Sequence, residues 1–156
     1  MAVNLGKKFE EQFRKDFLNI PNCSLDRLYD STSGYRGITN ISDFIGYVYP
    51  NIYYLEIKSI KGKTFPISNL TQYPKLVEKC GIKGVRTGVV IWYYDMDRVV
   101  YVPISTVSKF LENDIKSINI EKIDREEYFI LDIPSVKKRT FMTSDYTVLL
   151  TLEEGM

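Results

Sequence analysis

The first twenty residues carry apolar side chains at helical spacing. The apolar stripe consists of Leu5, Phe9, Phe13 and Phe17. Residues four apart lie on the same side of a helix, so the stripe predicts a helix with one buried face. Asn4 can cap its start and Pro21 prevents its continuation, which places the helix at about residues 4–19.

Further along the chain, β-prone runs alternate with shorter apolar stripes. The runs predict strands at residues 42–49, 52–59, 85–94 and 98–102, with a short one at 128–131. The stripes predict helices at residues 69–80 and 104–112. Leu25 and Leu28, which precede all of these, indicate a short strand or a turn. Helices and strands are therefore mixed along the whole chain.

The predicted strand at 52–59 carries two charges in an otherwise apolar run. Side chains two apart on a strand share a face, so Glu56 and Lys58 stand side by side. Leu55 and Ile57 face the opposite way, into a core. Buried charge is costly unless it is paired. The two charges therefore indicate either a site for a metal ion and a phosphate or an exposed sheet face with an ordinary ion pair.

A hairpin between the two strands of 42–59 would bring a third charge to this face. If the hairpin closes symmetrically about Pro50-Asn51, Asp43 lies opposite Lys58 and on the same face as Glu56. A register shifted by one residue would turn Asp43 to the other face.

Composition narrows the chemistry that the chain can perform. Its 156 residues, 44% hydrophobic and 26% charged, predict a single globular domain over residues 1–156. The absence of histidine excludes Ser-His-Asp and Cys-His catalysis and histidine metal sites. Cys23 and Cys80 alone cannot build a thiolate zinc site. Carboxylates, lysines and hydroxyls remain, and carboxylate oxygens suit Mg²⁺ or Mn²⁺.

The surroundings of the protein can be inferred on the same basis. Two cysteines without a secretory signal favour a reducing, cytoplasmic compartment. No apolar run reaches the roughly 20 residues of a membrane span. A net charge of +1 gives no global basic surface, so binding of a polyanion would need local clusters.

Three polar segments are candidates for such clusters. They contain Ser33 and Arg36, Lys61 and Lys63, and the run Lys137, Lys138 and Arg139. Hydroxyls, backbone N–H groups and cationic side chains of this kind contact nucleic-acid phosphates. Each segment has an ordinary alternative as a solvated surface loop.

The charged strand and its setting resemble the PD-(D/E)XK nuclease core, an α-β-β-β-α-β unit with a mixed central sheet flanked by helices. Glu-x-Lys alone is a weak signal, expected about once by chance in a chain with 10 Glu and 14 Lys. Within that superfamily, the chain is similar to the RecU-type Holliday junction resolvases and their phage-encoded relatives. The resemblance rests on Gly6–Glu11, Asp43-Phe44, Leu55–Ser59, Lys63–Pro66, Asn69–Gln72, the Gly-Val-Val-Ile run at 88–91 and Tyr101–Pro103.

The resemblance implies a role for each matching residue. Asp43 and Glu56 would hold Mg²⁺, for which Mn²⁺ is expected to substitute. Lys58 would orient or activate the attacking water and offset charge on the phosphate. Gln72 would have a further role at the metal, and Glu10 would be a carboxylate near the site.

One position departs from the family pattern. The family has a threonine two residues before the aspartate, where this chain has Ile41. Either that ligand is dispensable or the shell of metal ligands differs.

The function implied is a Mg²⁺-dependent, structure-selective DNA endonuclease that resolves four-way junctions as a homodimer. Two alternatives stay open. The same core could serve as a restriction or repair nuclease, or as a catalytically inactive module that binds DNA or a partner.

Overall fold

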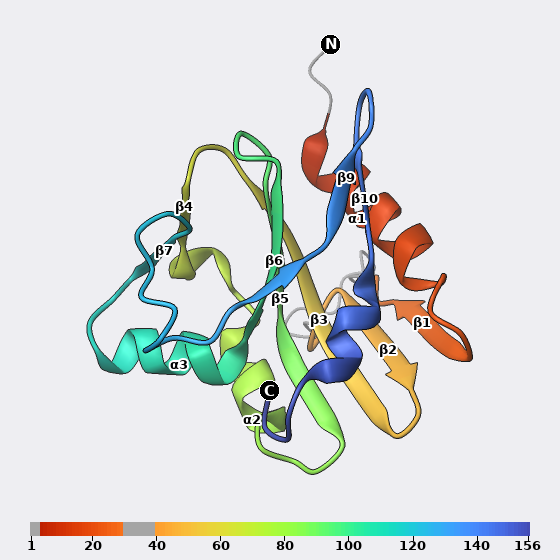
Figure 1. The fold of residues 1–156 in the computed structure, drawn as a ribbon. Coiled ribbons are helices and arrows are strands. Elements are labelled where there is room, and N and C mark those ends of the chain that lie inside the picture. The colour runs from red at the N-terminus through yellow and green to blue at the C-terminus, as the bar shows by residue number, and fades with distance from the viewer. Residues whose placement is uncertain (1–3, 30–39) are drawn as a thin grey trace, which may run out of the picture.

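The computed structural model describes residues 4–29 and 40–156 (Figure 1). The helices are α1 (Leu5–Phe17), α2 (Tyr73–Lys79) and α3 (Ile104–Glu112), with short 3-10 helices η1 (Ile67–Asn69) and η2 (Tyr146–Thr151). The strands are β1 (Cys23–Arg27), β2 (Phe44–Val48), β3 (Asn51–Ile60), β4 (Thr64–Pro66), β5 (Val85–Tyr93), β6 (Arg98–Pro103), β7 (Ser117–Asn119), β8 (Leu131–Ile133), β9 (Ser135–Lys137) and β10 (Met142–Ser144).

The centre of the molecule is a mixed sheet. Its six strands within the described residues run in the order β1-β2-β3-β5-β6-β8. The pair β3–β5 is parallel and the other pairs are antiparallel. In Figure 1, α1, η2 and the β9–β10 hairpin cover one face, and α2 and α3 lie on the other. Each face has its own apolar core.

The sequence prediction for α1 is confirmed. Asn4 caps the helix, since its Oδ1 accepts a hydrogen bond from the Lys7 backbone N–H at 3.1 Å. Phe9, Phe13 and Phe17 are buried against the sheet, as their spacing predicts.

The β2–β3 hairpin forms, but with a different register from the predicted one. Phe44 faces Leu55 and Val48 faces Asn51, so the turn is Tyr49-Pro50 and not Pro50-Asn51. Continued by one residue, this register sets Asp43 opposite Glu56 and not Lys58. The shift is two residues along β3, which keeps the face of the sheet unchanged because side chains alternate with a period of two.

Two other predicted elements differ from the structure. The helix expected at 69–80 is divided into η1 and the shorter α2, with Pro74 in the first turn of α2, where its missing N–H does no harm. The strand expected at 128–131 begins only at Leu131, because Tyr128 stacks on Phe110 of α3 with ring centroids 4.3 Å apart. The helix predicted at 104–112 has those bounds.

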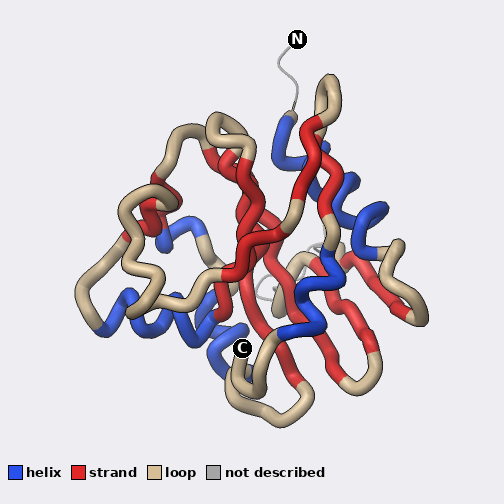
Figure 2. Tube along the Cα trace, viewed as in Figure 1, coloured by secondary structure: helices blue, strands red, loops and turns tan. Residues whose placement is uncertain are grey.

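The C-terminal part of the chain returns to α1. Asp16 of α1 is buried, and its carboxylate accepts hydrogen bonds from the Ser144 backbone N–H at 2.9 Å and the Thr143 hydroxyl at 3.0 Å. These bonds attach β10 to the helix (Figure 2). Among the described residues, no helix has the length and apolarity needed to span a membrane.

Candidate active site

The site forms where β2 begins. Asp43 directly precedes β2, and its Oδ2 accepts a hydrogen bond from the Ile57 backbone N–H at 2.8 Å. Asp43 thereby satisfies an amide of β3 at the point where the ladder with β2 has ended. Its backbone carbonyl accepts from the Leu28 N–H at 2.8 Å. The aspartate is therefore fixed at both its main chain and its side chain.

Glu56 lies next to Asp43 and is only 2% exposed. Its Oε2 is 3.8 Å from the Lys58 ammonium, whose side chain is 30% exposed. Its Oε1 is buried without a hydrogen-bond partner. The three charges predicted to share a face, Asp43, Glu56 and Lys58, are thus together.

Burial raises the pKa of Glu56 to about 8, and the neighbouring Asp43 charge adds to this effect. Lys58 and Arg27 act in the opposite direction but do not compensate. If both carboxylates are ionised, their negative charges repel each other and neither can donate a hydrogen bond to the other. A proton on Glu56 would allow it to donate a hydrogen bond to Asp43.

Arg27, at the end of β1, is a site residue that sequence reasoning missed. Its Nη2 forms an ion pair with Glu10 Oε2 at 3.1 Å, and its Nη1 lies 3.7 Å from Asp43 Oδ1. It also donates to the carbonyls of Leu28 at 2.7 Å and Asp43 at 3.0 Å. The rings of Phe44 and Tyr29 flank the guanidinium, at 5.3 and 5.4 Å. One arginine therefore joins α1, β1 and the start of β2.

A signal for Arg27 is present in the sequence. The alternation of β1 turns Cys23, Leu25 and Arg27 to the inner side and leaves Ser24 and Asp26 exposed. An arginine whose side chain faces inward together with apolar residues needs a partner that compensates its charge.

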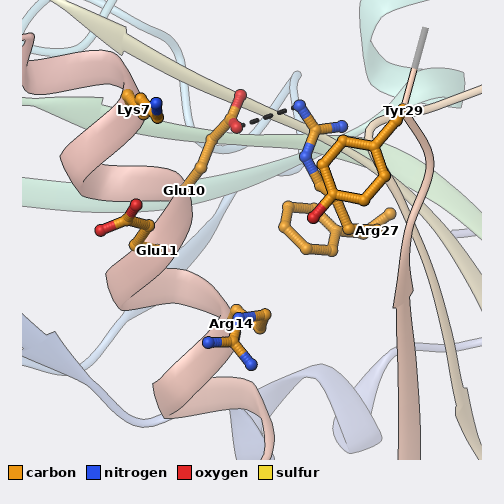
Figure 3. Close-up of a pocket in the computed structure, with 7 residues that line it drawn as sticks. Lys7, Glu10, Glu11, Arg14, Arg27 and Tyr29 are labelled. Atoms are coloured by element: carbon orange, nitrogen blue, oxygen red, sulfur yellow. Dashed lines mark hydrogen bonds and ion pairs between the residues drawn. The ribbon is translucent and has the colours of Figure 1, made fainter. Parts of the chain in front are cut away.

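Glu10 projects from α1 toward this arginine (Figure 3). Burial raises the pKa of Glu10, Arg27 opposes the shift, and the Asp43 charge adds to it. Glu10 therefore lies within electrostatic range of the Asp43–Glu56 pair. Both Glu10 and Arg27 line a cavity of about 370 Å³ between α1 and the segment after β1, together with Lys7, Glu11, Arg14, Tyr29 and Phe44.

Two carboxylate oxygens without a hydrogen bond fit a hard divalent cation. Asp43 Oδ1 and Glu56 Oε1 accept no hydrogen bond from any described residue. Within residues 4–29 and 40–156, no group of three or more Cys, Asp or Glu side chains is placed to hold a metal. Two carboxylates are nevertheless enough for Mg²⁺, which usually keeps several waters and takes further oxygens from phosphate.

Two further positions bear on the predicted shell of metal ligands. Gln72 is the residue before α2, and its side chain makes no hydrogen bond to Asp43 or Glu56 in the described structure. Its metal role stays a prediction. Ile41, in place of the family threonine, packs against the core under α2 and α3. Ser42 is turned away, because its hydroxyl donates to the Phe44 carbonyl at 2.8 Å.

The residues predicted to contact DNA differ in whether they already form an ion pair within the protein. Ser33 and Arg36 lie outside the described residues. Two of the others already have an ion pair: Lys63 with Glu121 at 3.2 Å and Lys137 with Asp97 at 3.0 Å. The remaining three, Lys61, Lys138 and Arg139, are exposed and have no ion pair with a described residue.

Comparison with known proteins supports the fold. No family model matches the sequence, and no curated protein matches it. The structure is similar to that of Archaeoglobus fulgidus Hjc, a Holliday junction resolvase from an archaeal hyperthermophile, with a TM-score of 0.56 and 17% sequence identity. The match covers 81% of this chain and 95% of that one. The predicted fold, a PD-(D/E)XK-type α/β core with a mixed sheet flanked by helices, is therefore confirmed.

Proposed function

We propose that this chain is a metal-dependent DNA endonuclease that resolves four-way junctions. The observation that carries the proposal is the meeting of Asp43, Glu56 and Lys58 at the end of the β2–β3 ladder. Support also comes from a fold shared with a protein described as a Holliday junction resolvase. Glu56 is costly to bury, and a catalytic role would account for it.

The proposed mechanism assigns a task to each side chain. Asp43 Oδ1 and Glu56 Oε1 would hold Mg²⁺ or Mn²⁺, and Gln72 is proposed to approach the same ion. When bound, the ion supplies Lewis-acid polarisation of the phosphodiester and a more acidic water. The Ile57 N–H and the Asp43 carboxylate, 2.8 Å apart, keep one ligand in place before substrate arrives.

Lys58 and Glu10 would act on the substrate side. The Lys58 ammonium can orient the attacking water and offset negative charge that develops on the phosphate. Glu10, held by Arg27 at 3.1 Å, would hydrogen-bond that water or a water of the metal. Arg27 is a positioning residue in this scheme because it fixes both Glu10 and the backbone of Asp43.

The proposed contacts with DNA are local, because the chain as a whole is nearly neutral. With a net charge of +1, the chain must contact DNA through local groups. We assign these contacts to Lys61, Lys138 and Arg139, with Lys63 and Lys137 exchanging their carboxylate partners for phosphate. Ser33 and Arg36 are proposed as further contacts.

A cleavage assay with a synthetic four-way junction tests the proposal. With Mg²⁺ or Mn²⁺ we expect paired nicks in opposed strands, and with a chelator no cleavage. Tight binding without cleavage would favour the inactive DNA-binding module. Equal cleavage of linear duplex would leave a nuclease but remove the assignment as a resolvase.

Asp43→Asn tests the metal assignment. The amide oxygen can still accept from the Ile57 N–H, so the fold should persist, but one charged ligand is lost. We expect cleavage to fall by a factor of about 10³, the upper range for loss of one electrostatic group, with unchanged junction binding in a gel-shift assay. Asp26→Asn, an exposed position on β1, is the matched control and should cleave normally. Normal cleavage by Asp43→Asn would contradict the metal assignment.

A further inference from the structure

The β9–β10 hairpin overhangs the start of α1 and the end of β5. Its tip carries the basic run 137–139, and its base is attached to α1 through Asp16. In Figures 1 and 2 the hairpin stands beside the N-terminal half of α1, well away from α2 and α3. The hairpin is therefore anchored to the core and is more than a solvated loop.

A cavity of about 220 Å³ lies under this hairpin. Three separate segments line it: Leu5 from α1, the stretch with Trp92, Tyr94 and Asp97 at and after the end of β5, and the hairpin tip with Lys137, Lys138 and Arg139. Its walls thus combine aromatic rings with three cationic side chains and one carboxylate, Asp97, which pairs with Lys137 at 3.0 Å.

Trp92 contributes a buried donor that has no acceptor. The residue is only 8% exposed, and its Nε1 makes no hydrogen bond in the structure. Its ring contacts are with Phe9 and, edge-on, with Tyr94, at centroid distances of 5.3 and 5.6 Å. An edge-on ring offers at most a weak N–H···π interaction. A buried donor is costly to leave unpaired, so an acceptor that enters the cavity and reaches Nε1 would remove this cost.

Two of the cationic side chains around the cavity also lack an acidic partner. Lys137 is paired with Asp97, but Lys138 and Arg139 have no ion pair with any residue that the structure describes. An indole N–H, an ammonium and a guanidinium are all donors without acceptor capacity. The complementary ligand is an anion with several acceptor oxygens, and phosphate has this chemistry.

The cavity adjoins the proposed catalytic cluster along the strand backbones but lies on the other face of the sheet, because Trp92 faces the α1 side and Lys58, paired with Ile91, faces the α2–α3 side. Trp92 pairs with Ser59 across the β3–β5 ladder, and Ser59 directly follows Lys58. Adjacent strands are about 4.8 Å apart, so the backbones of Trp92 and Lys58 are separated by less than about 10 Å.

We propose that the cavity under the β9–β10 hairpin binds a backbone phosphate of DNA other than the phosphate that is cut. Trp92 Nε1, Lys138 and Arg139 are its donors. This inference rests on the proposed function, since it assigns a second contact on the same substrate. The contact would direct one DNA arm along the α1 side of the sheet.

The chain contains a single tryptophan, which makes a direct test possible. The full-length protein is titrated with a four-way junction in a chelator while Trp92 fluorescence is followed. We expect the emission to change and to saturate at the same Kd as the anisotropy of labelled DNA. A titration with inorganic phosphate separates a free phosphate from a DNA backbone as the ligand. Phosphate should reproduce the change only at a much higher concentration, and an equal or tighter response to it would overturn the DNA assignment.

Charge variants supply the second arm of the test. Lys138→Gln and Arg139→Gln should each raise the Kd about five- to tenfold and lower the slope of log Kd against log salt by about one. Lys83→Gln is the matched control. Lys83 is exposed beyond the opposite end of β5, roughly 20 Å or more from Trp92 at about 3.3 Å per strand residue. Equal behaviour of Lys138→Gln, Arg139→Gln and Lys83→Gln would overturn the proposal.

Trp92→Phe keeps an aromatic ring and removes only the donor. We expect a Kd raised about three- to tenfold, with the response to Lys138→Gln retained. The outcomes also separate this proposal from the nuclease assignment. A saturating Trp92 signal without any cleavage would support the phosphate site in an inactive DNA-binding module. Junction cleavage with no change at Trp92 would overturn the site while leaving the nuclease intact.

Discussion

Among the residues of the candidate site, Glu56 carries most of the energetic cost of burial. It is 2% exposed, adjoins Asp43 and leaves Oε1 without a partner. The Lys58 ammonium at 3.8 Å is beyond hydrogen-bond distance and gives only partial compensation. A divalent cation between the two carboxylates would remove their repulsion and supply the missing contact.

We expect Mg²⁺ to stabilise the protein in the absence of DNA. A ligand at ten times its Kd stabilises the folded state by about 1.4 kcal/mol. For a chain of this length that corresponds to a rise in Tm of about 3–5 °C, measured by thermal unfolding with and without Mg²⁺.

The Glu56→Gln variant should lose this response, because it removes one of the two charged ligands. Its Tm without metal should equal or exceed that of the unmodified protein, since glutamine cannot ionise and so avoids the burial cost that raises the pKa of Glu56. Glu78→Gln, at an exposed position on α2, serves as the control and should keep the full rise in Tm. A Mg²⁺ response retained by Glu56→Gln would place the ion elsewhere.

Among the elements, α1 and β2 are in closest contact at Gly46. A Cβ at this position would lie 2.8 Å from Phe17 Cζ and 3.4 Å from Leu25 Cδ1. Phe17 is fully buried, with its ring packed among those of Phe13 and Tyr53. It therefore cannot retreat, and the glycine sets the distance at which α1 presents Glu10 to Arg27.

Gly46→Ala is accordingly expected to destabilise the protein by about 1–3 kcal/mol, the usual cost of overpacking a core. Urea denaturation provides the measurement. Gly6→Ala is the comparison, because its Cβ would be 3.4 Å from the nearest atom, Ser59 Oγ, in ordinary contact. That change should be neutral or slightly stabilising in the first turn of α1. Equal stabilities for the two variants would show that α1 has room to move on the sheet.

At the scale of the whole molecule, one chain carries one Asp43–Glu56–Lys58 cluster among its described residues. Resolution of a four-way junction requires two incisions in opposed strands. A two-fold symmetric pair of chains meets that requirement directly, because it places two equivalent sites on a substrate of the same symmetry.

We therefore expect a homodimer. Sedimentation equilibrium should give twice the chain mass of 18.2 kDa at the concentrations at which junctions are cut in both strands. A monomer that still makes paired incisions would contradict this expectation. The fold alone does not decide the point, since nothing in the sheet order requires a second copy.

The sequence by itself determined the local features of this protein. The spacing of apolar residues gives α1 and α3, and the period of two along β3 puts Glu56 and Lys58 on one face. The lack of histidine restricts the chemistry to carboxylates and lysine. All of these depend on neighbours within a few residues.

The tertiary structure alone decided the contacts between distant segments. It set Asp43 opposite Glu56 through a turn one residue earlier than predicted, and it brought Arg27 between Glu10 and Asp43. It also enclosed Trp92 beneath a hairpin more than forty residues later in the chain. The physical reason is that strand register and the pairing of buried polar groups depend on how whole faces pack, which no local pattern encodes.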